Sequence, residues 1–110
     1  MTDQMLDGDR KLCEVTKRLI HAYRPERIYL FGSMARGDAR PDCDYDLLVV
    51  VSDNVESERR GSRLAYIALR GTGAAADVFV STRARFEART HVLASLPATV
   101  LREGRLLYAA

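Results

Sequence analysis

Three aspartates stand at positions where an acidic side chain is unexpected. Asp44 and Asp46 open the most hydrophobic segment of the chain, and Asp77 interrupts another apolar stretch, AADVFVS. Residues two apart on a strand project from the same face, and neighbouring carboxylates repel each other unless something binds them. Oxygen ligands with open positions suit Mg²⁺, which keeps several waters and binds substrate phosphates. If the strands that carry them lie close, we expect the three carboxylates to converge as a metal site.

A Gly32-Ser33 pair precedes these acids, with ten residues between Ser33 and Asp44. Glycine lets a ligand approach the backbone closely, and Ser33 as a helix N-cap offers N–H groups and a hydroxyl to a phosphate. Arg36, one helical turn later, can add a charge to the same phosphates; a solvated surface arginine is the alternative. Acids that hold a metal beside a phosphate-binding turn indicate phosphoryl or nucleotidyl transfer.

Predicted helices and strands alternate along the chain. Apolar residues at helical spacing predict a first helix from about Arg10, capped by Asp7 or Asp9 and ended by Pro25. Further helices are predicted at about 55–70, from the cap Thr82 to about His91, and at 97–104; strands are predicted at 27–31, 45–51, 75–81 and, as an edge strand, 105–108. This order predicts an α/β (α+β) fold with a small mixed sheet of three to four strands flanked by helices.

Composition restricts the class of protein. A length of 110 residues predicts a single domain over 1–110, with a loose polar lead at 1–8, and the net charge of +2 is too small to predict direct nucleic-acid binding. The two cysteines lack the spacing of a zinc site or a disulfide framework. With a polar N-terminus and no apolar run near the roughly 20 residues that span a bilayer, we expect a cytoplasmic protein without membrane contact.

The two-part pattern, Gly32-Ser33 and then Asp44-Tyr45-Asp46, resembles the signature of the DNA polymerase β-like nucleotidyltransferase superfamily. The wider stretch FGSMARGDARPDCDYDLLVV is similar to its minimal nucleotidyltransferase (MNT) branch, and the likeness extends to the acid on the third strand and the ending LREGRLLYA. Two positions depart from the common pattern: Cys43 stands where serine is frequent, and Met34 where a basic residue is frequent. Neither departure removes a metal ligand, so we expect activity to survive.

The resemblance implies a nucleotidyltransferase fold and a role for each site residue. The two acids of the DxD motif would hold two Mg²⁺ ions that bridge the triphosphate and the α-phosphate under attack. Asp77 would complete the metal site nearest the acceptor hydroxyl and help to deprotonate it. Gly32 and Ser33 would bind the β- and γ-phosphates, with Arg36 beside them.

MNT proteins are typically paired with a small helical protein of the HEPN type, often an RNA-cleaving toxin, and act as its antitoxin. The resemblance therefore implies AMPylation: transfer of an NMP, with AMP from ATP favoured, to a tyrosine of a HEPN-family toxin within a hetero-oligomer. Two alternatives stay open. One is a non-catalytic antitoxin that neutralises the toxin by binding; the other is modification of a small hydroxyl compound such as an aminoglycoside, which larger relatives achieve with a second domain.

Overall fold

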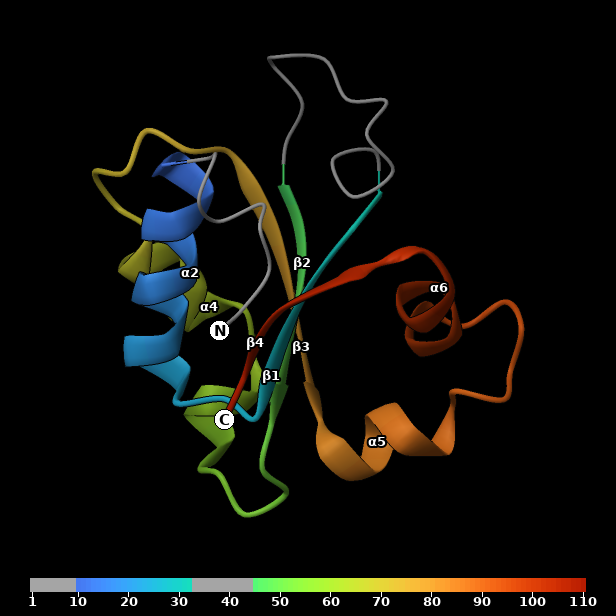
Figure 1. Ribbon diagram of the computed structural model, residues 1–110. Helices are drawn as coiled ribbons and strands as arrows, with labels where there is room; N and C mark the ends of the chain where they lie inside the picture. The colour runs from blue at the N-terminus through green and yellow to red at the C-terminus, as the bar shows by residue number, and fades with distance from the viewer. Residues whose placement is uncertain (1–9, 33–44) are drawn as a thin grey trace.

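The computed structural model describes residues 10–32 and 45–110 (Figure 1). Their elements are α2 (Arg10–Tyr23), β1 (Arg27–Phe31), β2 (Tyr45–Val51), the 3₁₀ helix η1 (Ser57–Arg60), α4 (Arg63–Ala68), β3 (Ala76–Thr82), α5 (Arg83–Ala88), α6 (Leu96–Glu103) and β4 (Arg105–Ala109). The strands form one sheet in the order β3-β2-β1-β4, in which β2 and β3 are parallel and the other pairs antiparallel. The predicted mixed sheet flanked by helices is confirmed.

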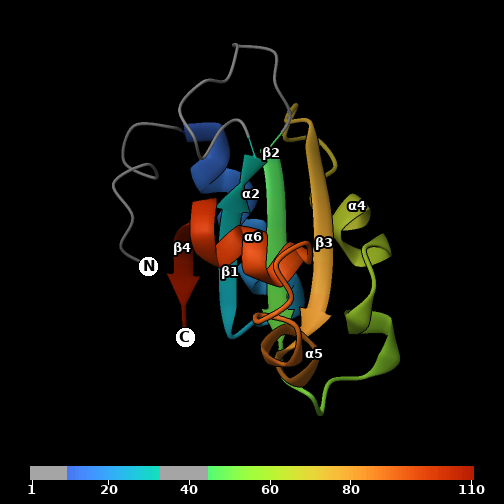
Figure 2. The ribbon, with the colours of Figure 1, turned by 90° about the vertical axis from the view of Figure 1, so that its right-hand side faces the viewer.

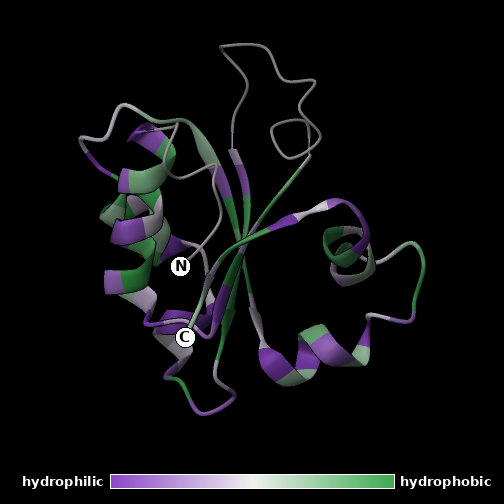
Figure 3. Cartoon of the chain, in the orientation of Figure 1, coloured by the Kyte–Doolittle hydropathy of each residue, from purple (hydrophilic) through white to green (hydrophobic). Residues whose placement is uncertain are grey.

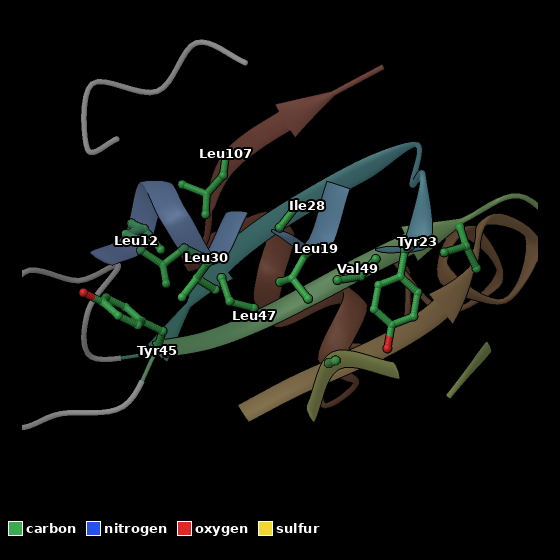
Figure 4. Packing of buried hydrophobic residues seen from close by; sticks show 12 residues of the cluster. Leu12, Leu19, Tyr23, Ile28, Leu30, Tyr45, Leu47, Val49 and Leu107 are labelled. Carbon is green, nitrogen blue, oxygen red and sulfur yellow. The ribbon is translucent and has the colours of Figure 1, made fainter. Parts of the chain in front are cut away.

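Helices α2 and α4 cover one face of this sheet, and α5 and α6 lie on the other (Figures 1 and 2). Apolar residues at helical spacing make one side of α2 bury itself against the strands, and hydropathy changes accordingly around that helix (Figure 3). The resulting cluster combines Leu12, Val15, Leu19 and Tyr23 of α2 with Ile28, Leu30, Tyr45, Leu47, Val49, Val51, Ala65 and Leu107 (Figure 4).

The second face carries a smaller core. Tyr29, Leu48 and Val50 pack there against Phe86 of α5 and Val100 of α6. The rings of Tyr29 and Phe86 stack with their centroids 5.6 Å apart. Burial on both faces explains why β2 reads as an almost continuous apolar run, since alternate residues enter different cores.

Two predicted helices differ from the observed ones. The helix expected at about 55–70 is wrong as a single element, because Gly61 adopts an extended conformation (φ −115°, ψ 170°) between η1 and α4. The helix capped by Thr82 ends at Ala88 and not near His91, and the Thr90 hydroxyl donates to the Glu87 carbonyl in the turn that follows. The lead at 1–8 and its capping aspartates lie outside the described residues. Within 10–32 and 45–110, no helix is long and apolar enough to cross a membrane.

A hydrogen bond from Tyr23 links the end of α2 to the segment before α4. The buried Tyr23 hydroxyl donates to the Gly61 carbonyl at 2.7 Å, and burial raises the pKa of Tyr23 above its ordinary value of 10.0 although a backbone hydrogen bond from Ala65 opposes the shift. Above about pH 10 the unfolded chain loses the Tyr23 proton while the folded protein keeps it. The free energy of unfolding therefore falls as the pH rises past that value.

We expect Tyr23→Phe to lower the free energy of unfolding by about 1 kcal/mol at pH 7 through the lost hydrogen bond. Above pH 10 the variant should lose stability less steeply than the wild type, because no buried phenol remains to be ionised. Urea unfolding at pH 7, 10 and 11 measures both effects. Parallel pH profiles for the two proteins would contradict the assigned role of the Tyr23 proton.

Candidate functional site

Two of the three predicted acids meet on neighbouring strands. The parallel register of β2 and β3 makes Asp46 and Asp77 direct partners across the sheet, where adjacent strands lie about 4.8 Å apart. Tyr45 and Leu47, on either side of Asp46, point into the core under α2 and α4. Asp46 therefore projects from the opposite face, which α5 and α6 cover, as does Leu48 two residues later. The Asp77 side chain is exposed and that of Asp46 is partly exposed. Sequence reasoning expected this convergence only if the two strands paired, and they do.

The two described helices on this face, α5 and α6, do not lie over the beginnings of β2 and β3, where the acids stand. In Figure 2, α6 crosses the middle of the sheet and α5 lies near the end of β3. Two cavities line the opposite, α2/α4 side: one of about 340 Å³ between α4 and β3, and one of about 460 Å³ between α2 and α4. Neither cavity is lined by Asp46 or Asp77.

Gly32 is placed against the carboxylate of Asp46. Phe31, the last residue of β1, pairs with Asp46, and the next residue turns away with φ at +75°. A Cβ atom added to Gly32 would collide with Asp46 Oδ2. Glycine therefore suits this position for two reasons: it adopts the left-handed backbone conformation without strain, and it has no Cβ atom to overlap the Asp46 carboxylate. Sequence reasoning anticipated close approach of a ligand here, but not this intramolecular requirement.

Two phenylalanines border the acids, and sequence reasoning did not assign them to the site. Phe31 of β1 and Phe79 of β3 place their ring centroids 5.8 Å apart at an interplanar angle of 49°. Phe79 follows Asp77 by two residues and therefore projects from the same sheet face. The period of two within the third apolar stretch was the signal that could have identified it.

Ser33, Arg36 and Asp44 fall within residues 33–44, outside the described part of the chain, so their predicted roles stay predictions. Among the residues that the structure describes, no three His, Cys, Asp or Glu side chains gather closely enough to hold a metal ion. The pair formed by Asp46 and Asp77 nevertheless offers the type of ligand atom, carboxylate oxygen, that Mg²⁺ prefers. It supplies carboxylate oxygens from two neighbouring strands, and the absence of a Cβ atom at Gly32 lets the Asp46 carboxylate lie against the turn after β1.

Comparison with protein families decides the broader class. The family model described as "Nucleotidyltransferase domain" matches residues 12–107. The chain belongs to the nucleotidyltransferase domain family. Curated protein sequences give no significant match. The resemblance inferred from the Gly-Ser and DxD motifs is thereby confirmed at the level of the family and its fold.

Solved structures share the nucleotidyltransferase fold at low sequence identity. A putative nucleotidyltransferase from Sulfolobus solfataricus superposes with a TM-score of 0.60 at 20% identity, covering 91% of this chain and 78% of that one. A toxin–antitoxin complex with AMP-PNP contains a chain with a TM-score of 0.58 at 22% identity, covering 87% and 72%. A complex of a tri-AMPylated HEPN toxin from Shewanella oneidensis with its MNT antitoxin gives 0.51 at 19%, covering 91% and 73%.

Proposed function

We propose that this nucleotidyltransferase is the antitoxin of a toxin–antitoxin pair and moves AMP from ATP, with Mg²⁺, to a tyrosine hydroxyl of a HEPN-type toxin. The observation that carries the proposal is the cross-strand pair of Asp46 and Asp77, with Gly32 against it, in a nucleotidyltransferase domain. Two structural neighbours support the substrates: one is a toxin–antitoxin complex with AMP-PNP, and the other contains a tri-AMPylated HEPN toxin.

Each residue of the site has a distinct task in this reaction. Asp44, Asp46 and Asp77 would hold two Mg²⁺ ions, which supply neutralisation of the triphosphate charge when bound. Gly32 and Ser33 orient the β- and γ-phosphates through backbone N–H groups and a hydroxyl. Arg36 would add its charge to the same phosphates.

Proton transfer falls to Asp77, the exposed acid on the edge strand. Its carboxylate accepts the proton of the acceptor hydroxyl while the hydroxyl oxygen bonds to the α-phosphorus. The bond between that phosphorus and the bridging oxygen breaks in line, and pyrophosphate leaves with the electron pair. The products are an AMP–tyrosine phosphodiester and pyrophosphate, so no oxidant or reductant is needed.

The direct test incubates the purified chain with a HEPN-type toxin, Mg²⁺ and ATP labelled at either the α- or the γ-phosphate. We expect label on the HEPN protein from α-labelled ATP only, mapped by mass spectrometry to a tyrosine. Omission of the divalent cation should remove the label. Absence of transfer from every nucleoside triphosphate tested would refute the proposed activity.

A non-catalytic antitoxin is the second candidate, because the neighbouring structures are complexes in which the antitoxin is bound to its toxin. The two functions differ in what an Asp44→Asn variant does in cells that co-express the toxin. Catalysis predicts that this variant binds the toxin but no longer protects growth. Full protection by Asp44→Asn, at equal protein levels, would assign neutralisation to binding alone.

A further inference from the structure

The rings of Phe31 and Phe79 meet over the middle strand of the site. Their strands, β1 and β3, flank β2 on opposite sides, so the two backbones are about 9.6 Å apart, twice the spacing of adjacent strands. The ring centroids are only 5.8 Å apart. The two side chains therefore lean toward each other across β2. Phe31 pairs with Asp46, and Phe79 pairs with Leu48, which places the aromatic contact directly beside the carboxylates.

This aromatic pair lies beside the smaller core. Leu48 is buried, and Phe31 packs against the cluster that α5 and α6 cover. Phe79 differs from its neighbours because 45% of its surface is exposed, although it is a large apolar side chain next to that cluster. An aromatic surface thus lies exposed along the same strand as Asp77.

We propose that Phe79, supported by Phe31, positions the aromatic ring of the acceptor so that its hydroxyl meets Asp77. This inference rests on the proposed function and deepens it, because it makes selection of tyrosine over serine or threonine a property of this chain. Residues two apart on a strand are roughly 6.6 Å apart, a distance that a phenol can span between a ring contact and a carboxylate. Stacked and tilted aromatic pairs are both favourable, so the ring of Phe79 offers a phenol a contact that an aliphatic hydroxyl lacks.

We assign the Phe79 ring to the acceptor, and not to the nucleobase of ATP, because of the strand on which Phe79 lies. Phe79 shares the exposed edge strand β3 with Asp77, the acid proposed to accept the acceptor's proton. Gly32, proposed to bind the phosphates, lies two strands away at the end of β1. A ring on β3 is therefore on the acceptor side of the carboxylates. Phe79 acts as a positioning residue with no part in bond making.

The test measures steady-state AMP transfer to the HEPN-type toxin used in the transfer assay above, with the acceptor and ATP varied separately. For Phe79→Ala we expect the KM for the acceptor to rise about three- to tenfold, the range given by loss of an aromatic contact. The KM for ATP should stay within about twofold, since Phe79 makes no nucleotide contact in this proposal. Phe79→Leu keeps an apolar side chain and should behave like Phe79→Ala, whereas Phe79→Tyr should behave like wild type.

Leu93→Ala is the matched control, because Leu93 is an apolar side chain that is 80% exposed and lies on the connection between α5 and α6. It should change neither KM. An increased KM for ATP in Phe79→Ala, restoration by Phe79→Leu, or an unchanged acceptor KM would each overturn the inference while leaving the proposed function intact. A wild-type protein that transfers no label would instead refute the proposed function, and the inference with it.

Discussion

Replacement of Asp46 by asparagine is expected to reduce AMP transfer by about 10³-fold or more, equivalent to about 4 kcal/mol of lost transition-state stabilisation. The substitution keeps the size of the side chain but removes the negative charge that a divalent cation requires. Asp46 is central to the site, because its strand neighbours are Asp77 on one side and Phe31 on the other, and Gly32 abuts its carboxylate. Transfer from α-labelled ATP to the HEPN protein measures the loss.

Asp53→Asn provides the control for removing one carboxylate without disturbing the site. Asp53 lies in the turn after β2, is exposed, and accepts a hydrogen bond from the Ala84 backbone at 2.9 Å, which an asparagine oxygen can also accept. We expect Asp53→Asn to retain full transfer and both variants to keep the wild-type circular dichroism spectrum. Substantial transfer by a folded Asp46→Asn protein would exclude Asp46 as a metal ligand.

The sheet was predictable because its strands carry strong local signals. The strands at 27–31 and 45–51 match β1 and β2, and the C-terminal edge strand and the short helix before it were also found within a residue or two. In β2 the apolar run is continuous because each side chain enters one of two cores. The sequence does not contain the pairing of β2 with β3, which depends on packing between segments that are distant in the chain.

The predicted helix at about 55–70 contains a glycine, and that residue is where the structure differs from the prediction. Gly61 adopts an extended conformation that separates η1 from α4. The Tyr23 hydroxyl then donates to the Gly61 carbonyl, so a contact from α2 stabilises the break. That contact joins residues 38 positions apart and could not be read from helical periodicity.

For the candidate site too, the sequence indicates which residues take part, whereas their mutual placement comes from the fold. Asp46, Asp77 and Gly32 could be proposed from the sequence, because acids within apolar strands and a glycine at a strand end are visible there. Their mutual placement needed the register, which pairs the two acids and brings the glycine against one of them. The aromatic contact over β2 was missed because Phe31 and Phe79 each have an ordinary role as apolar strand residues when they are considered singly.

Gly32→Ala is expected to lower AMP transfer by about 100-fold, the loss that a displacement of roughly 1 Å in a reacting group can cause. The new methyl group would collide with Asp46 Oδ2, so either the carboxylate or the backbone of the turn must move. The same substitution also forces a residue with a Cβ atom into a left-handed conformation, since φ is +75° at Gly32. That strain alone costs about 1 kcal/mol and affects stability without regard to the site.

Gly71→Ala separates these two consequences. Gly71 has φ at +83°, close to that of Gly32, but a Cβ atom added there meets nothing within 4 Å. Both alanine variants should therefore show a similar decrease in melting temperature, while only Gly32→Ala loses transfer. If Gly71→Ala lost as much activity as Gly32→Ala, backbone strain and reduced stability would explain both, and the contact with Asp46 would have no special part in catalysis. Equal destabilisation with unequal activity instead assigns the loss to the displaced carboxylate.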